Sequence, residues 1–284
     1  MASSTPLSGI FGLFSGKPRH PVGADGRMAL TDHLRELRAR LLRSALVLVA
    51  AFVVSLFFYE QLLDLIEAPY LDARAQLGDE VESEIVITGV TQPLMLQLKL
   101  AGVAAIVVSS PYWLMQIWGF IVPGLHPQEK RWTRVFAAIA GPLFIAGVAL
   151  GYYVLPKGIE VLIGFTPVDV TNLVDFGDFF SFVVRMLLVF GIAMEIPLFV
   201  IMLNLAGVVS GKTIGRYRPW IIIGTFVFAA VATPSTDPFS MLMLAIPMLV
   251  LFVVAEIVAR LVDRARGRGE AATGQWDDDE TSPI

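Results

Sequence analysis

Side chains suited to chemistry are few in this sequence, and their placement limits what they can do. The chain has no cysteine, which excludes disulfides, thiolate metal sites and cysteine nucleophiles. Its three histidines all lie outside the long apolar runs, which disfavours a histidine metal site or an intramembrane triad. Three acids stand out: Glu36 and Glu129, each among basic residues, and Glu195, within an apolar run.

Nucleotide-binding and hydrolytic motifs are missing. The run from Gly207 to Thr213 is one residue short of a phosphate-binding loop, and it follows an apolar stretch instead of a strand. Neither the H-E-x-x-H pattern of zinc peptidases nor the G-x-S-x-G pattern of serine hydrolases occurs. We therefore predict no enzyme activity, no catalytic residue, no metal and no cofactor. Any transport would draw its energy from an ion gradient or from a partner.

The elements that carry these residues are predicted to be transmembrane helices. Hydrophobic residues make up 56% of the chain and charged residues only 16%, a balance typical of proteins in lipid. Crossing the ~30 Å hydrocarbon core takes about 20 apolar residues. Six stretches qualify or nearly qualify: 42–58, 93–121, 133–155, 179–205, 219–232 and 239–258. The fifth reaches only about 21 Å at ~1.5 Å per residue, so we expect it to form a short hairpin with the sixth.

The distribution of basic residues predicts which way the spans run. Most of the 21 lysines and arginines lie before the first span, after the second, after the fourth and in the C-terminal tail. Because cytoplasmic loops are enriched in these residues, we expect both termini in the cytoplasm of a multi-pass protein in a bacterial-type cytoplasmic membrane. Three regions are predicted: a disordered N-terminus over 1–27, a membrane domain over 28–262 and an acidic tail over 263–284.

Charged residues within the spans need a reason, because a charge at the centre of a membrane helix costs at least about 2.5 kcal/mol. Glu195 lies well inside the fourth span, and a functional contact is favoured over a purely structural one. Lys99 and Arg185 each lie roughly 9 Å from the outer end of a span. We therefore expect their side chains to reach the outer interface.

An amphipathic helix is predicted before the first span, on the cytoplasmic interface. Leucines recur at helical spacing over 28–41, which gives this stretch one apolar face. Glu36 can pair with Arg40 one turn on, a contact worth only about 0.2–0.5 kcal/mol. A surface ion pair is likewise the simplest interpretation of Glu129. The spacing alone favours these structural roles over functional ones.

Small residues and prolines inside the spans predict how the helices pack. Gly147 and Gly151 form a G-x-x-x-G pair, for which packing within the chain is favoured over a dimer contact. Prolines within a helix remove a backbone donor and kink it, and several kinked helices indicate a curved wall. These prolines are Pro111, Pro142, Pro197 and Pro247.

Several motifs, in order along the chain, resemble those of the TatC family. The pattern H-L-x-E-L-R-x-R-L from His33 to Leu41 is similar to the family's N-terminal signature. The run Q-x-W-x-F-x-x-P-x-L from Gln116 to Leu125, followed by Glu129, resembles its first cytoplasmic loop. Further matches are F-G-x-x-x-E-x-P at 190–197, Arg218-Pro219, the turn at 233–240 and Ala245-Ile-Pro247.

The resemblance implies a core receptor component of the twin-arginine protein export machine, driven by the proton motive force. It implies that Glu36 and Glu129 recognise the twin-arginine signal peptides of folded precursors. The chemistry is consistent, because a carboxylate can bind a guanidinium through two parallel hydrogen bonds and lysine cannot match that geometry. Arg38 and Phe120 match family positions in the same region and are expected to shape or orient the site.

The resemblance also implies an all-α fold of six kinked transmembrane helices in a concave, glove-like bundle with short spans five and six. Glu195 matches the family's intramembrane carboxylate, which is implied to contact single-span partners of the TatA and TatB type. Pro69 and Asp237 match positions in outer loops that support this shape. One departure concerns the acid expected after the Ile-Pro of span six: Val253 occupies its place, and Glu256 follows one turn on.

Two other classes of function stay open on the residues alone. A secondary transporter of a small solute could line a midplane site with Glu195, Lys99 and Arg185, although neither an inverted repeat nor paired broken helices are evident. An intramembrane enzyme has no catalytic constellation to support it. Membrane lipid is the expected surrounding, and nucleic acid is not expected as a partner.

Overall fold

A computed structural model describes residues 30–78, 83–121, 130–167, 170–234 and 237–265. The predicted N-terminal region 1–27 and the tail beyond 265 lie outside these residues. The described chain is almost entirely helical, which confirms the predicted class, and it also contains two four-residue strands that the sequence did not predict. The last helix continues to Ala265, beyond the domain boundary predicted at 262.

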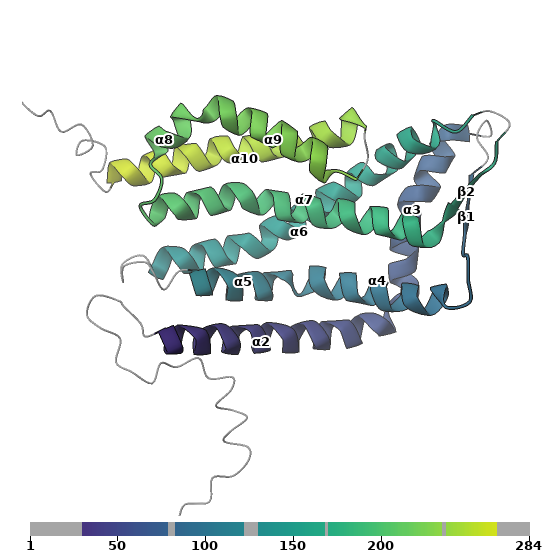
Figure 1. Ribbon diagram of the computed structural model, residues 1–284, viewed down its shortest axis with the longest axis horizontal. Helices are drawn as coiled ribbons and strands as arrows, with labels where there is room; N and C mark the ends of the chain where they lie inside the picture. The colour runs from purple at the N-terminus through teal and green to yellow at the C-terminus, as the bar shows by residue number, and fades with distance from the viewer. Residues whose placement is uncertain (1–29, 79–82, 122–129, 168–169, 235–236, 266–284) are drawn as a thin grey trace, which may run out of the picture.

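Long helices lie side by side and account for most of the structure (Figure 1). They are α2 (Leu30–Phe57), α4 (Gln92–Val108), α5 (Ser110–Ile121), α6 (Lys130–Ile163), α7 (Phe176–Leu205) and α10 (Pro238–Ala265). The helix α2 packs on α4 and α5, α5 packs on α6, and α7 packs on both α6 and α10. Among the described residues, four helices are long and apolar enough to cross a membrane, or five if the bent pair α4–α5 is one span.

The first helix is longer than the sequence predicted. A separate amphipathic helix on the interface was expected before the first span, but α2 runs without a break through both. That expectation is wrong in this respect. The physical reason is that the stretch contains neither glycine nor proline, so nothing interrupts the backbone hydrogen bonds where the polar part gives way to the apolar part.

A further helix, α3 (Tyr59–Leu77), follows α2 directly where a loop was expected. It buries one face, including Ile66, Tyr70 and Ala73, and the Tyr70 hydroxyl lies 2.8 Å from the buried hydroxyl of Ser83. Pro69 is therefore buried inside a helix, and the prediction that it lies in an outer loop is wrong. Long apolar runs do not reveal α3, because this helix is amphipathic and carries several acids.

The second predicted span is bent, as its proline indicated. The helices α4 and α5 meet at an angle of 57°, with Ser109 and Ser110 buried at the break and Pro111 just after it. The Ser109 hydroxyl donates to the Ala105 carbonyl at 2.6 Å, which satisfies an acceptor near the end of α4.

The predicted short hairpin is also present. The helix α9 (Arg218–Ala232) has only 15 residues, about 22 Å at ~1.5 Å per residue, and it packs against α10. A six-residue helix, α8 (Gly211–Arg216), links α7 to it, and the Ser210 hydroxyl caps the start of α8 by accepting from the Thr213 N–H.

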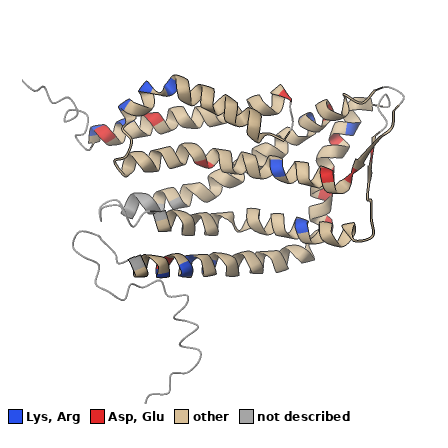
Figure 2. Cartoon of the chain, viewed as in Figure 1, with Lys and Arg blue, Asp and Glu red and all other residues tan. Residues whose placement is uncertain are grey.

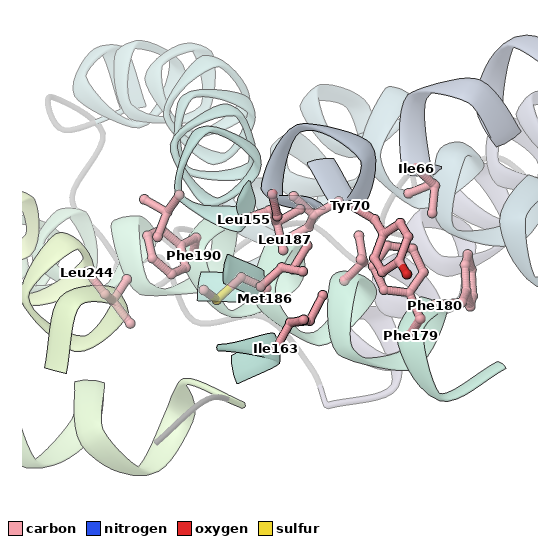
Figure 3. Packing of buried hydrophobic residues seen from close by; sticks show 14 of the residues in the cluster. Ile66, Tyr70, Leu155, Ile163, Phe179, Phe180, Met186, Leu187, Phe190 and Leu244 are labelled. Atoms are coloured by element: carbon pink, nitrogen blue, oxygen red, sulfur yellow. The ribbon is translucent and has the colours of Figure 1, made fainter. Parts of the chain in front are cut away.

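The core of the molecule lies where α6 crosses α7, and glycines bring the two helices together. A Cβ on Gly147 would meet the Phe190 carbonyl oxygen at 2.6 Å, and one on Gly151 would meet the Phe190 side chain at 3.0 Å. The prediction that this glycine pair packs within the chain is confirmed. Figure 3 shows Phe190, Leu155 and Met186 in the cluster that this close approach produces.

At the opposite end from the start of α2, a two-stranded sheet joins distant segments. Strands β1 (Ser83–Val86) and β2 (Asn172–Asp175) pair in parallel, with Ser83 opposite Asn172. Asp175 then caps α7 by accepting from the Gly177 N–H at 2.7 Å. It also accepts from the Thr88 hydroxyl and from the Gln92 amide, so one carboxylate holds the starts of α4 and α7 together.

We expect this junction to weaken in acid. The hydrogen bonds from Thr88 and Gln92 lower the pKa of Asp175 from 3.8 to about 2. A lowered pKa in the folded state stabilises the fold above the ordinary pKa and loses that contribution as the pH falls toward 2. The protection of the Gly177 and Asp178 amides, measured as exchange relative to an unprotected amide at the same pH, should therefore fall between about pH 4 and pH 2. The Asp175→Asn variant should be less protected at neutral pH and show little further loss of protection in that range; equal protection profiles would contradict the assignment.

Charge is sorted along the molecule (Figure 2). Basic residues gather mainly where α2 begins, where α8 lies and where α10 ends. Acidic residues gather at the other end, on α3, β1 and the start of α7. From the distribution of lysine and arginine, the sequence predicted that the basic end faces the cytoplasm and that the acidic end faces the outside.

Candidate functional site

The start of α2 lies against the end of α5, and several residues of the predicted binding region meet there. The His33 and Phe120 rings stack with centroids 4.4 Å apart and planes 16° apart. Further along α2, Arg40 donates to the Glu36 carboxylate and, at 3.4 Å, to the Gln116 side-chain oxygen. Gly119 leaves the space that the Arg40 guanidinium fills, since a Cβ there would lie 2.5 Å from it.

The Glu36 carboxylate is bound to Arg40 on one side only. Arg40 donates from Nε at 2.9 Å and from its terminal nitrogen at 2.6 Å, and both bonds fall on Oε1. Among the described residues, no donor binds Oε2. The predicted pairing of Glu36 with Arg40 is thus confirmed, and it leaves one carboxylate oxygen available to another donor.

Not every predicted member of this region comes together. Arg38 lies two residues from Glu36, hence on another face of α2, and it is exposed. Glu129 lies outside the described residues. The structure therefore places Glu36, which pairs with Arg40, in the same region as Phe120, which stacks on His33. Arg38 lies on a different face of α2. Sequence reasoning missed the His33–Phe120 stack because it joins residues that are far apart in the chain.

Glu195 lies in the interior of the bundle, on α7. Both of its carboxylate oxygens are inaccessible to solvent, and neither has a hydrogen-bond partner among the described residues. The indole of Trp118 on α5 interacts with this carboxylate, although its buried N–H forms no well-formed hydrogen bond. The Trp118 ring packs in turn against Phe199, at 6.0 Å between centroids. The side chain of Trp118 therefore helps to enclose the carboxylate.

Asp237 lies directly before α10, in the turn between α9 and α10, as predicted from the sequence motif. Its Oδ1 accepts from the Ser240 N–H at 2.6 Å, which caps the helix. Its Oδ2 is buried without a partner among the described residues, and Gly158 of α6 leaves space beside it. Asp237 thus caps α10 at a point where the turn lies close to α6.

A charged cluster at the basic end, which sequence reasoning did not predict, holds α8, α9 and α10 together. Glu256 is buried on α10 and accepts from Arg218 at the start of α9, at 2.8 Å, and from Arg260 at 2.9 Å. Nearby, the buried Asp263 accepts from the Gly211 N–H at 2.6 Å and from the Asn204 amide at 3.0 Å. Glu256, the displaced acid of span six, therefore has a structural partner. The motif Arg218-Pro219 was the sequence signal that could have identified this partner.

The two basic residues within the apolar spans are exposed. Lys99 on α4 and Arg185 on α7 form no ion pair or hydrogen bond within the described part of the chain. Their exposure fits the expectation that these side chains extend toward the outer interface. Among the described residues there is also no group of three or more histidines and acids that could hold a metal ion.

The long apolar helices, the bent span and the short terminal hairpin define a multi-span membrane protein. Residues 32–247 match the family model described as Sec-independent protein translocase protein (TatC). The chain belongs to this family of protein translocase components, which are transport proteins and not enzymes. The family resemblance predicted from the motifs is confirmed.

Relatives and solved structures agree with this assignment. The Sec-independent protein translocase protein TatC of Frankia casuarinae is 41% identical over 92% of this chain and 74% of that protein. The corresponding protein of Corynebacterium kroppenstedtii is 37% identical over 92% of this chain and 68% of its own length. A crystal structure described as the twin arginine translocase receptor TatC is 30% identical, covers 82% of this chain and all of that chain, and has a TM-score of 0.65.

Proposed function

We propose that this protein is the receptor component of a twin-arginine translocase and that it binds twin-arginine signal peptides of folded precursors where α2 meets α5. The observation that carries the proposal is the Glu36 carboxylate, which Arg40 holds through Oε1, whereas no donor in the described part of the chain binds Oε2. Family membership supports it, as does the fact that a structure of similar fold is described as a twin arginine translocase receptor.

The geometry suggests how an arginine of the signal peptide would be held. The incoming guanidinium would bind Oε2 of Glu36 or displace Arg40, whose side chain is about one-quarter exposed. Glu129 would supply the second carboxylate, and Phe120, stacked on His33, would form an apolar wall beside it. Arg38, on another face of α2, would act on the signal peptide outside this pocket or on the lipid surface.

The orientation and assembly follow from the same proposal. Six crossings would place both termini in the cytoplasm, with α9 as a short fifth span in a locally thin bilayer and the helices forming a concave bundle. Localisation would be the bacterial cytoplasmic membrane. Single-span partners of the TatA and TatB type would assemble at the α7 surface near Glu195, and the proton motive force would drive transport. Because both Glu195 oxygens are buried, this contact would require neighbouring side chains to move.

The proposal is tested by peptide binding to the detergent-purified protein. A labelled twin-arginine signal peptide should bind, and a twin-lysine version should bind at least about tenfold more weakly, because lysine forms no bidentate contact. Glu36→Gln and Glu129→Gln should each weaken binding to a similar degree. Glu84→Gln, an exposed acid on β1 at the other end, is the matched control. Equal binding of both peptides by all variants would show nonspecific attraction and would refute the site.

A further inference from the structure

A groove that the proposed receptor function does not use lies toward the acidic end of the molecule. It is formed by α3, the later part of α6 and the start of α10, and it has a volume of about 730 Å³. Figure 1 shows these three segments toward the same end. The groove is lined by Asp72, Ala75, Gln76, Tyr152, Tyr153, Pro156, Lys157 and Phe239.

The groove combines aromatic rings with an acid. Tyr152 donates its hydroxyl to the Leu65 carbonyl at 2.9 Å, which holds its ring against α3, and it lines the groove together with Asp72. Tyr153 is 78% exposed, so its ring is free to contact a ligand, and Phe239 adds a third ring. A carboxylate beside aromatic faces is the arrangement that attracts an ammonium group.

The groove carries charged side chains of both signs, and the negative charge at Asp72 is not neutralised by an ion pair in the described part of the chain. Lys157 is paired with Glu160, at 2.6 and 2.8 Å, and nearly half of its side chain is exposed. Asp72 has no ion pair among the described residues. The groove therefore carries an excess of negative charge around Asp72, with one ammonium group at its rim. A ligand that complements it bears a cation and an anion a few bonds apart.

The position of the groove indicates where such a ligand comes from. Tyr152, Tyr153 and Lys157 lie in the last three to four turns of α6 before it ends at Ile163, toward one end of the apolar span. Tyrosines and lysines at the end of a membrane helix lie at the level of the lipid headgroups. Exposed apolar area beside the groove would meet the acyl chains, whereas its polar lining would meet the headgroup.

We propose that this groove binds the headgroup of a zwitterionic phospholipid of the outer leaflet, with the ammonium at Asp72 and Tyr153 and the phosphate at Lys157. The proposal rests on the orientation given under the proposed function but not on signal-peptide binding. An anionic lipid fits less well, because Asp72 and Glu160 would repel it. An apolar partner helix fits less well too, because it would cover Asp72, Gln76 and Lys157 without pairing them.

Native mass spectrometry of the purified protein with defined lipids tests this proposal. The protein should retain phosphatidylethanolamine and phosphatidylcholine in preference to phosphatidylglycerol. Asp72→Asn and Tyr153→Ala should each reduce that retention by about fivefold. Glu60→Gln, an exposed acid on the same helix but outside the groove, should leave it unchanged. Equal retention of all three lipids, or no effect of Asp72→Asn, would overturn the proposal.

Two more measurements distinguish lipid binding from a folding defect and from dimer formation. The variants should keep the unfolding temperature and the signal-peptide affinity of the parent protein. A failure of the receptor proposal would therefore be detected separately from a failure of the lipid proposal. A mass corresponding to two protein copies that is lost in Tyr153→Ala would mean that a second copy occupies the groove. That outcome would also overturn the lipid assignment.

Discussion

Gly147→Leu is expected to abolish the folded protein. A Cβ at this position would lie 2.6 Å from the Phe190 carbonyl and 2.9 Å from the Gly191 Cα, both of them backbone atoms that cannot turn aside. A whole leucine side chain would force α6 and α7 apart along the interface that forms the core. Overpacking of a core typically costs about 1–3 kcal/mol, and a backbone clash across two long helices should exceed that range. The measurement is the yield of monodisperse protein after size-exclusion chromatography in detergent.

Gly224→Leu is the matched control, because Gly224 is also helical but nothing lies within 4 Å of a Cβ there. Leucine at this exposed position of α9 should leave the yield unchanged or raise it, since glycine is disfavoured in helices by about 0.8–1 kcal/mol. If both variants behaved alike, the close approach of α6 and α7 would not be what holds the core together.

Glu195→Leu is expected to stabilise the protein while it removes assembly with single-span partners. The carboxylate oxygens have neither solvent nor a hydrogen-bond partner among the described residues, and such a buried group is costly. Leucine of similar length removes this cost, so the unfolding temperature in detergent should rise by a few degrees. Under the proposed function, copurification of the partners should be lost in the same variant. A fall in the unfolding temperature would show that Glu195 has a structural role.

Trp118→Phe provides the complementary test. Phenylalanine keeps a ring to pack near Phe199 but removes the indole N–H, which interacts with Glu195. This change should lower the unfolding temperature of the parent protein. It should have a smaller effect in the Glu195→Leu background, because the carboxylate with which the N–H interacts is then absent. Additive effects of the two changes would mean that the tryptophan and the carboxylate do not interact.

Local patterns made several features predictable. The Glu36–Arg40 contact follows from helical spacing, and the bend after α4 follows from Pro111. That Gly147 and Gly151 pack within the chain follows from the spacing of small residues. Each of these depends on residues within a few turns of one another, so a single sequence holds the information.

Other features were missed because they depend on which distant segments meet. The pairing of β1 with β2 joins residues about 90 positions apart, as Ser83 and Asn172 show. The helix α3 was overlooked because its stabilising face, with Tyr70 and Pro69, becomes visible only against α6 and α4. The predicted interfacial helix before the first span was wrong because amphipathicity does not show where a helix without glycine or proline ends.

The sequence by itself determined that this is a helical membrane protein of the TatC family, and it singled out Glu36, Glu195 and Glu256 as acids whose contacts needed an explanation. Apolar runs, basic loops and ordered motifs are properties that can be recognised in the sequence alone. Only the tertiary structure decided what those carboxylates contact: Arg40 for Glu36, the vicinity of Trp118 for Glu195, and two arginines for Glu256. The physical reason is that hydrogen bonds and desolvation act over a few ångströms between side chains, and the fold alone decides which side chains come that close.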